Sequence, residues 1–469
     1  MIMRSQHFID REAELEFLEK EYEAPRPSFV IVYGRRRIGK TELIRVFCRG
    51  KPYVYFLADK SPTRINIRRF LDSASEQLGI DLLRGVEVED WESAVNLVLR
   101  LKEARGKLVL VFDEFPYLVE ADRNTPYVFQ RLWDLHLSRR DDVMLVLVGS
   151  SIGMMESLLG YRSPLYGRRT GQWKLTEVPL RSLREFLPRY GLEDLVRVYG
   201  AVGGVPLYLN LVDDELGFYE NVERLFLSKG GFLYEEAENL LRMELRELRN
   251  YKLILRAIAE GYVRYGEIAS YTGLDRSAVS RYLEVLETLD LVSYELPALA
   301  SPKAKRRRYY IKDNYFAFWF RYVDPYRPKV EEGRVGEVLE DIRGDYETYM
   351  GWVFERLAVK LIARTGVWDR VGRQWGRAKG GVYEIDIVAI NARDNLLLVG
   401  EAKWSKLGVR DVKAIVADLR KKATYIDWRL NERREVYTVV AREVEDREEI
   451  EKEYEDVKVY TLDDVFRLL

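Results

Sequence analysis

The amino-acid sequence predicts an α/β fold: a core with a parallel sheet, then a helical lid, a winged helix and a C-terminal α/β domain. Four short apolar runs alternate with helical stretches in residues 28–151, and a glycine-rich turn follows the first run directly. Strand and helix patterns alternate again in the last third of the chain. Strands that are apolar on both faces need helices above and below them, which is typical of a parallel sheet.

The length of 469 residues exceeds what one ordinary core accommodates. We expect four domains: the core at 1–178, the lid at 179–250, the winged helix at 251–327 and the last domain at 328–469. A charged linker is expected at Pro328 to Gly333.

The composition excludes several classes of protein. The 76 basic and 77 acidic residues nearly cancel, so any nucleic-acid binding must come from local patches. The single cysteine, Cys48, excludes an internal disulfide framework. With only two histidines besides, any metal should be a hard cation held by oxygen, such as Mg²⁺. No signal peptide and no run of roughly 20 apolar residues is found, so we expect a cytoplasmic protein without membrane contact.

The core domain should begin with a helix over Arg11 to Tyr22, with Asp10 as its N-cap. The apolar runs that follow are predicted as buried strands. They are SFVIVYG, PYVYFL, KLVLVFDE and VMLVLVGS. In an open α/β sheet, ligands bind at the carboxyl edge of such strands.

The first strand ends in GRRRIGKT, Gly34 to Thr41, which fits the phosphate-loop pattern G-x-x-x-x-G-K-[ST]. A strand precedes the pattern and a helical stretch follows it, as the pattern requires. Backbone N–H groups and the helix N-terminus would surround the phosphates of ATP. Lys40 should reach the outer phosphates as a catalytic cation, and Thr41 should ligate Mg²⁺. The expected nucleotide-binding residues are Gly34, Arg35, Arg36, Arg37, Ile38, Gly39, Lys40, Thr41 and Glu42.

Two further strands carry polar residues at their ends. Asp113 should hold the magnesium through water, and Glu114 should polarise the attacking water. Ser150 or Ser151, after the VMLVLVGS strand, could touch the γ-phosphate or that water, unless both only form the turn.

Arginines at the end of SPLYGRRTG are candidates for the charge that stabilises the transferring phosphoryl group. Arg168 or Arg169 could act within the chain or on a neighbouring subunit of a homo-oligomer. Surface arginines are commonplace, so the alternative is that neither takes part.

These motifs together resemble the archaeal ATPase family within the STAND class of P-loop NTPases. The matching segments are FIDREAEL (Phe8 to Leu15), GRRRIGKT, the Asp113–Glu114 pair, the serine-ending strand, PLYGR (Pro164 to Arg168) and GGVPLYL (Gly203 to Leu209). The resemblance implies an additional-strand P-loop core followed by a helical lid and a winged helix. It also implies that Gly204 and Pro206 lie near the nucleotide, although GGVP could be a plain helix-breaking turn.

Residues 252–295 predict a helix-turn-helix with Gly273 in the turn and Asp275 capping the next helix. One face of that helix should be exposed and could read DNA, with Arg276, Ser277, Ser280 and Arg281. The basic run Lys303 to Tyr310 would be the wing and would contact phosphates. The alternative is a winged helix that serves as a packing or interaction module.

The last domain places acids on two predicted strands. Asp386 lies in GGVYEIDIVAI, and Glu401 and Lys403 lie in LLLVGEAKW. Pairing of these strands would bring Asp386 and Glu401 together as an open Mg²⁺ site, with Lys403 beside it. Glu355, on the preceding helix, could add a fourth polar group. The alternative is a structural ion pair between Lys403 and a carboxylate.

This second constellation resembles the PD-(D/E)XK nuclease core, over about residues 350 to 425. In the archaeal ATPase family a C-terminal domain of unknown function of the DUF234 type is a companion of this kind. The resemblance implies Mg²⁺-dependent cleavage of DNA by Asp386, Glu401, Lys403 and Glu355. Two hypotheses follow: an ATP-controlled nuclease, or a non-cutting ATPase switch whose last domain binds DNA or protein. A transcription regulator that uses the winged helix ranks third.

Overall fold

The computed structural model describes residues 8–102, 106–301, 303–304, 306–378 and 381–469. The chain divides into two units. The first unit comprises Met1–Val178 and Val205–Leu207, and the second comprises Pro179–Gly204 and Tyr208–Leu469. Each unit is described by itself below.

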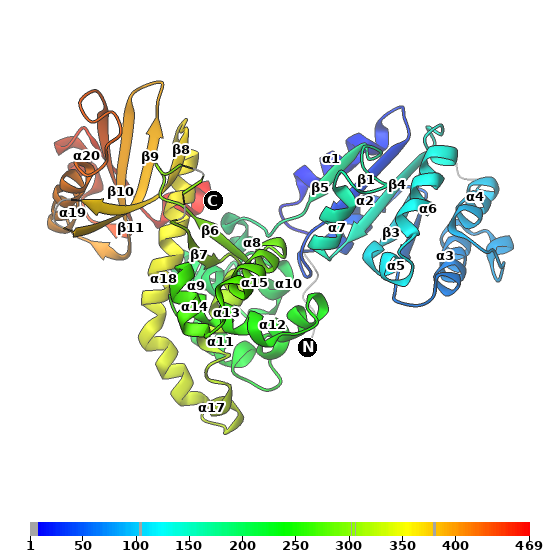
Figure 1. Cartoon of the computed structure of the whole chain (residues 1–469), viewed down its shortest axis with the longest axis horizontal. Helices are drawn as coiled ribbons and strands as arrows, with labels where there is room; N and C mark the ends of the chain where they lie inside the picture. Colours follow the sequence, from blue (N-terminus) through cyan, green and yellow to red (C-terminus); the bar gives the residue numbers. More distant parts are fainter. Residues whose placement is uncertain (1–7, 103–105, 302, 305, 379–380) are drawn as a thin grey trace. The chain divides into compact units, whose positions relative to one another are not determined.

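The first unit is built on a sheet of five parallel strands in the order β2-β3-β4-β1-β5 (Figure 1). The strands are β1 (Ser28–Tyr33), β2 (Tyr53–Leu57), β3 (Leu108–Asp113), β4 (Val143–Gly149) and β5 (Gly171–Lys174). Every residue of β1, β3 and β4 is buried, as the uniformly apolar runs predict. The predicted parallel sheet is confirmed, and β4 lies between β1 and β3.

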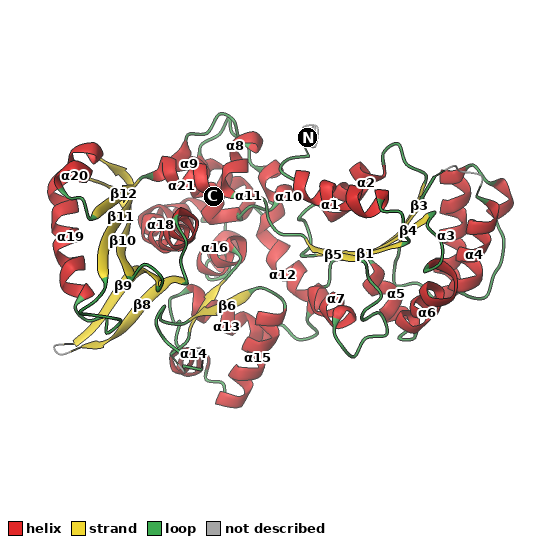
Figure 2. Cartoon of the chain, turned by 90° about the horizontal axis from the view of Figure 1, so that it is seen from above, coloured by secondary structure: helices red, strands yellow, loops and turns green. Residues whose placement is uncertain are grey.

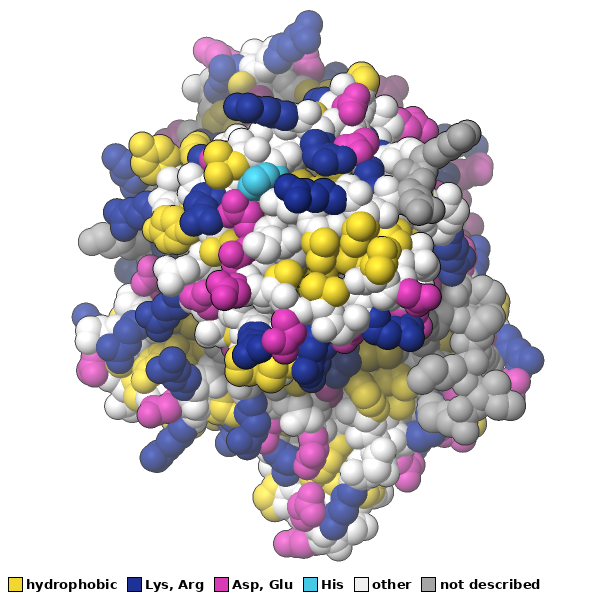
Figure 3. All heavy atoms as spheres, turned by 90° about the vertical axis from the view of Figure 1, so that its right-hand side faces the viewer, with side chains coloured by type: hydrophobic (Ala, Val, Ile, Leu, Met, Phe, Trp, Pro, Cys, Tyr) yellow, Lys and Arg dark blue, Asp and Glu magenta, His cyan; other side chains and the backbone are white. Residues whose placement is uncertain are grey.

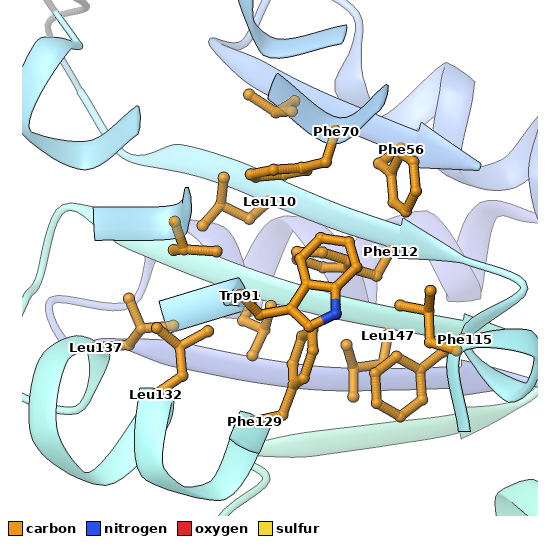
Figure 4. Packing of buried hydrophobic residues seen from close by; sticks show 14 of the residues in the cluster. Phe56, Phe70, Trp91, Leu110, Phe112, Phe115, Phe129, Leu132, Leu137 and Leu147 are labelled. Carbon is orange, nitrogen blue, oxygen red and sulfur yellow. The ribbon is translucent and has the colours of Figure 1, made fainter. Parts of the chain in front are cut away.

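Helices cover both faces of this sheet (Figure 2). One face packs against α1 (Glu12–Glu23) and α2 (Lys40–Cys48). The other face packs against α3 (Thr63–Leu78), α4 (Trp91–Leu101), α5 (Phe115–Ala121), α6 (Thr125–Leu132) and α7 (Ile152–Leu159). Aromatic rings dominate this second layer, where Phe70 stacks on Phe112 and Phe129 meets Phe112 edge to face (Figure 4). These rings pack against β3 as far as Phe112, the residue before Asp113.

The predicted N-cap of the first helix is wrong. Helix α1 begins at Glu12, and Asp10 has a positive φ of 52° instead of a capping conformation. The reason lies in Arg11, whose buried guanidinium donates to the carbonyl oxygens of Ile38 and Thr176 at 3.1 and 2.8 Å. These long-range bonds draw Arg11 inward and move the start of the helix to Glu12.

The second unit surrounds one almost wholly buried helix, α16 (Asn314–Tyr322, NYFAFWFRY). Because α16 is apolar on all sides, it needs partners all round. Its aromatic rings contact α11 (Phe218–Phe226) and the long helix α18 (Val335–Thr365). Other helices of this unit are α8 (Leu183–Phe186), α9 (Leu192–Val202) and α12 (Phe232–Glu244), while α10 (Pro206–Leu211) crosses the division between the units.

The winged helix is present in the second unit. It consists of α13 (Arg249–Ala259), α14 (Tyr265–Thr272), α15 (Arg276–Thr288) and the antiparallel hairpin of β6 (Val292–Glu295) and β7 (Arg308–Ile311). Gly273 ends α14 with a φ of +66°, and the Asp275 side chain accepts from the N–H of Ala278 at 2.9 Å. Both expectations for the turn are confirmed.

A mixed sheet in the order β12-β11-β10-β9-β8 forms the C-terminal part. Its strands are β8 (Arg370–Ala378), β9 (Gly381–Asn391), β10 (Leu396–Leu407), β11 (Arg434–Val444) and β12 (Val457–Tyr460). Helix α18 packs against one face, and α19 (Val409–Ala423) packs against the other (Figure 2). The short helices α20 (Arg447–Glu453) and α21 (Leu462–Leu468) complete it. The predicted fold class is therefore confirmed as an α/β core, a helical region with a winged helix, and a mixed α/β domain.

Two details of the C-terminal half differ from expectation. The segment expected to be a linker is largely helical, as α17 (Arg327–Glu331), because Pro328 occupies the first turn, where its missing N–H costs nothing. Edge strand β8 was not predicted, because RVGRQWGRA alternates too weakly.

One face of the molecule agrees with the near-zero net charge. Figure 3 shows basic and acidic side chains interspersed on one face, without a broad field of one sign among the side chains coloured by type. Among the residues that the structure describes, no helix is long and apolar enough to span a bilayer.

Candidate active site

The phosphate loop, Gly34 to Thr41, joins β1 to α2. At Gly34, which has a φ of +155°, an added Cβ would lie 2.3 Å from the carbonyl oxygen of Leu175, so only glycine fits there. Gly39 also has a positive φ, +91°, where the helix begins. The buried Lys40 amine donates to the carbonyl oxygens of Gly34 and Arg35 at 2.8 and 2.7 Å. The loop thus curls around the ammonium group of Lys40.

Asp113, at the end of β3, meets this loop. It is 1% exposed, and its Oδ2 accepts from the Thr41 hydroxyl at 2.9 Å and from the Tyr55 hydroxyl. Its Oδ1 accepts from the N–H of Glu114 at 2.8 Å. The predicted pair of magnesium-binding oxygens, on Thr41 and Asp113, is therefore in direct contact.

Glu114 follows in a strained conformation, with a φ of +52° that places it at the start of α5. Its Oε1 accepts from the Ser150 hydroxyl at 2.5 Å and lies 3.8 Å from Arg36. Its Oε2 is buried and has no hydrogen-bond partner in the described part of the chain. A buried carboxylate oxygen needs a donor, and a water molecule or a ligand would supply one.

Other predicted residues of this site lie around the loop. Arg36 donates to the Tyr117 hydroxyl at 2.9 Å, and Arg35 lies 3.5 Å from Glu177. Ile38 is buried, Arg37 is exposed, and Glu42 is partly exposed on the first turn of α2. All of these remain predictions as nucleotide ligands.

Arg168 does not join the group. Its guanidinium makes a bidentate pair with Asp134 at 2.9 to 3.0 Å and donates to the carbonyl oxygen of Pro164 at 2.8 Å. In the described residues, none of its hydrogen bonds reaches the phosphate loop, Asp113 or Glu114. Its neighbour Arg169 makes one long bond, 3.4 Å, to the carbonyl oxygen of Leu159.

The sequence did not reveal three side chains that support the site. Tyr55 bonds Asp113, Tyr117 bonds Arg36, and Arg11 bonds the loop carbonyl of Ile38. Only Arg11 carried a signal, because it belongs to the FIDREAEL segment. The two tyrosines lie 58 and 81 residues from their partners, and no local pattern marks them.

The second constellation forms where β9 and β10 part. The antiparallel ladder ends at Gly400–Ile387, and the next residue of β9, Asp386, accepts from the N–H of Ala402 at 3.1 Å. Glu401 pairs with Lys403 at 2.7 Å and with Lys422 at 3.5 Å. The predicted hairpin is thus present and gathers Asp386, Glu401 and Lys403 at one place.

Burial disfavours the charged form of two acids, Asp386 and Glu355. It raises the pKa of Asp386 to about 6, with the nearby Glu401 carboxylate adding to the shift. Burial likewise raises the pKa of Glu355, on α18, to about 7, although Arg373 opposes the shift. Arg373 pairs with Glu355 at 3.0 Å. In the described residues, no group of three or more His, Cys, Asp or Glu side chains is arranged to hold a metal ion.

The exposed face of α15 matches expectation: Arg276, Ser277, Ser280 and Arg281 are exposed, whereas Val279, Leu283 and Leu286 are buried. The wing needs a correction. Arg308 is buried and makes a bidentate pair with Glu384 at 2.5 and 3.0 Å, so it belongs to a packed interface instead of a phosphate-binding surface. Lys303, Arg306 and Arg307 are exposed, and Lys305 lies outside the described residues.

This geometry defines a P-loop ATPase core followed along the chain by a winged helix. Three family models match different parts of the chain. One, described as an ATPase domain predominantly from Archaea, matches residues 8–212. One for bacterial regulatory proteins of the arsR family matches residues 252–294, and one for archaeal and bacterial proteins of unknown function matches residues 319–415. The predicted archaeal ATPase domain, helix-turn-helix and C-terminal domain of unknown function are therefore confirmed. None of the three descriptions mentions a nuclease.

Individual proteins with similar sequences or structures support the same assignment. An uncharacterized protein of Methanocaldococcus jannaschii is 35% identical over 449 residues, which cover 94% of this chain and 97% of that protein. The chain belongs to the same family as that protein. An uncharacterized ATP-binding protein of Pyrococcus horikoshii is 26% identical and covers 56% of this chain and 88% of its own length. The Walker-type ATPase of Pyrococcus abyssi has a similar fold, with a TM-score of 0.52 and 22% identity over 68% of this chain and 97% of that one.

Proposed function

We propose that the protein binds ATP with Mg²⁺ and hydrolyses it at the phosphate loop, as a STAND-type ATPase. The observation that carries the proposal is the meeting of three strand ends. Thr41, in the loop after β1, donates to Asp113 at the end of β3. Ser150, after β4, donates to Glu114, whose own N–H donates to Asp113. A mutually bonded set of these residue types is what phosphoryl transfer from ATP to water requires.

Each side chain has a role in this proposal. Lys40 and the loop N–H groups bind the outer phosphates. Thr41 and Asp113 hold Mg²⁺, which neutralises charge on the phosphate oxygens when it is bound. Ser150 fixes Oε1 of Glu114, so that Oε2 is left to accept a proton from the attacking water.

We infer further that the winged helix binds DNA. The exposed N-terminal face of α15 supports this inference, because it has the cations Arg276 and Arg281 and two hydroxyl groups. The exposed basic side chains of the wing support it as well.

Replacing both Arg276 and Arg281 with alanine is expected to weaken binding of duplex DNA about tenfold at low salt. The loss of two cations from the DNA-binding face should also reduce the slope of log affinity against log salt by about 1 to 2. Fluorescence anisotropy at several salt concentrations measures both quantities. Arg343→Ala, an exposed arginine on α18 paired with Glu340, is the control and should change neither. Equal affinity and slope in the double variant would favour a winged helix that only packs or binds protein.

A second candidate activity is Mg²⁺-dependent DNA cleavage by the C-terminal domain. The supporting observation is the cluster of Asp386, Glu401 and Lys403 at the point where β9 and β10 part. Two neighbouring acids, one with a pKa raised by burial, gain from a cation between them, and Lys403 can stabilise a charged phosphate. Under this proposal, the nucleotide bound to the ATPase domain controls DNA cleavage by the C-terminal domain.

Lys403→Ala is expected to abolish cleavage of plasmid DNA in Mg²⁺, a loss of roughly 100-fold or more, because the positive charge beside the scissile phosphate is removed. Gel assays of the wild type and the variant, with and without ATP, measure it. The matched control is Lys406→Ala, three residues along β10, whose amine pairs with Glu443 and Glu445. DNA left intact by the wild type in every condition would favour the alternative, a non-cutting switch with the last domain as a binding module.

A further inference from the structure

Tyr55 lies in the middle of edge strand β2, and other segments contact this strand on both of its sides. On the inner side, β2 pairs with β3, with Tyr55 opposite Val111. On the outer side, where an edge strand has unpaired groups, the amide of Gln77 on α3 bonds both the N–H and the carbonyl of Tyr55, at 2.7 and 2.9 Å. The position of Tyr55 is therefore fixed from two sides.

The side chain reaches the acid of the candidate ATP site. The Tyr55 hydroxyl donates to Oδ2 of Asp113, the oxygen that also accepts from Thr41. A phenol keeps its proton at neutral pH and therefore remains a hydrogen-bond donor here. The ring also lies 5.9 Å from the Arg45 guanidinium of α2. A strand outside the phosphate loop thus contacts the acid directly.

We propose that Tyr55 is a positioning residue for the magnesium-dependent step of ATP binding. The inference rests on the proposed function of the Thr41–Asp113 pair. The carboxylate of Asp113 is held at three points: by Glu114 N–H on Oδ1, and by Thr41 and Tyr55 on Oδ2. With Tyr55 in place, Asp113 presents a fixed oxygen geometry to a cation held beside Thr41. Without the phenol, Oδ2 loses one of its two donors, and the carboxylate gains freedom to turn.

This role differs from that of a ligand to the phosphates. The Tyr55 hydroxyl donates to Asp113, and its other side-chain hydrogen bond is to Thr41, so both contacts are to the proposed magnesium-binding pair. Removing the hydroxyl should therefore leave the affinity for metal-free ATP unchanged and weaken only the gain in affinity that Mg²⁺ supplies. Outer partners of metal ligands typically affect metal affinity in this way.

The test is equilibrium binding of a fluorescent ATP analogue to the full-length protein, in EDTA and over a titration of Mg²⁺. For Tyr55→Phe we expect wild-type affinity for the analogue in EDTA. The factor by which Mg²⁺ increases that affinity, which we call the enhancement, should fall roughly tenfold, because one hydrogen bond to a charged group is lost. Tyr53→Phe, two residues earlier on the same face of β2, is the control and should behave as the wild type.

The outcomes separate the two claims. An enhancement in Tyr55→Phe equal to that of the wild type, or an equal loss of affinity with and without Mg²⁺, overturns the positioning role while the ATP site stands. No binding of the analogue by the wild type in either condition overturns the proposed function and, with it, this inference.

Discussion

Replacing Lys40 with alanine is expected to reduce ATP turnover on the order of 10²- to 10³-fold. The Lys40 amine is buried inside the phosphate loop and makes short bonds to two of its carbonyl oxygens. Alanine removes the cation that would face the outer phosphates and leaves those carbonyl oxygens without their donor. Both substrate binding and stabilisation of the transferring phosphoryl group should suffer.

Release of inorganic phosphate from ATP measures this effect. Lys20→Ala, an exposed lysine on α1, changes the net charge equally and should retain full turnover. Turnover by the Lys40 variant at the rate of the control would mean that ATP is hydrolysed somewhere other than the phosphate loop.

Replacing Glu114 with glutamine is expected to separate binding from hydrolysis. Glutamine has nearly the same shape, and its amide oxygen can still accept from Ser150, so the start of α5 should be preserved. It cannot take a proton from water at neutral pH. Hydrolysis should therefore fall roughly 10²- to 10⁴-fold while ATP affinity stays within a few-fold of the wild type.

A pair of assays checks this separation: single-turnover hydrolysis, and equilibrium binding of ATP. Glu120→Gln, an exposed acid at the end of the same helix, provides the comparison. A Glu114 variant that hydrolyses ATP normally would remove this residue from the mechanism. One that no longer binds ATP would show that its role is to hold the loop.

The sequence predicted the features that depend on local pattern. The phosphate loop needs glycine at two positions with positive φ, and a strand and a helix flank it, so the motif alone defines its geometry. The parallel sheet followed from strands without polar positions. Asp275 as a cap and the β9–β10 hairpin also followed from short-range rules.

Features that depend on long-range pairing could not be predicted. Arg308 was assigned to phosphates because it lies in a basic run, yet it pairs with Glu384. The ion pair of Arg168 with Asp134 was likewise not predicted. A single sequence does not show which acid will fold against which arginine. The contact of Tyr55 with Asp113 is of the same kind, since the order of the strands decides it.

The central claim is that one site joins the loop after β1 to the acids at the end of β3. A crystal structure of the protein with Mg²⁺ and a non-hydrolysable ATP analogue tests this most directly. We predict a triphosphate enclosed by Gly34 to Thr41, with the cation held by the Thr41 hydroxyl and, through water, by Asp113. A nucleotide bound elsewhere, or phosphates remote from Asp113 and Glu114, would contradict it.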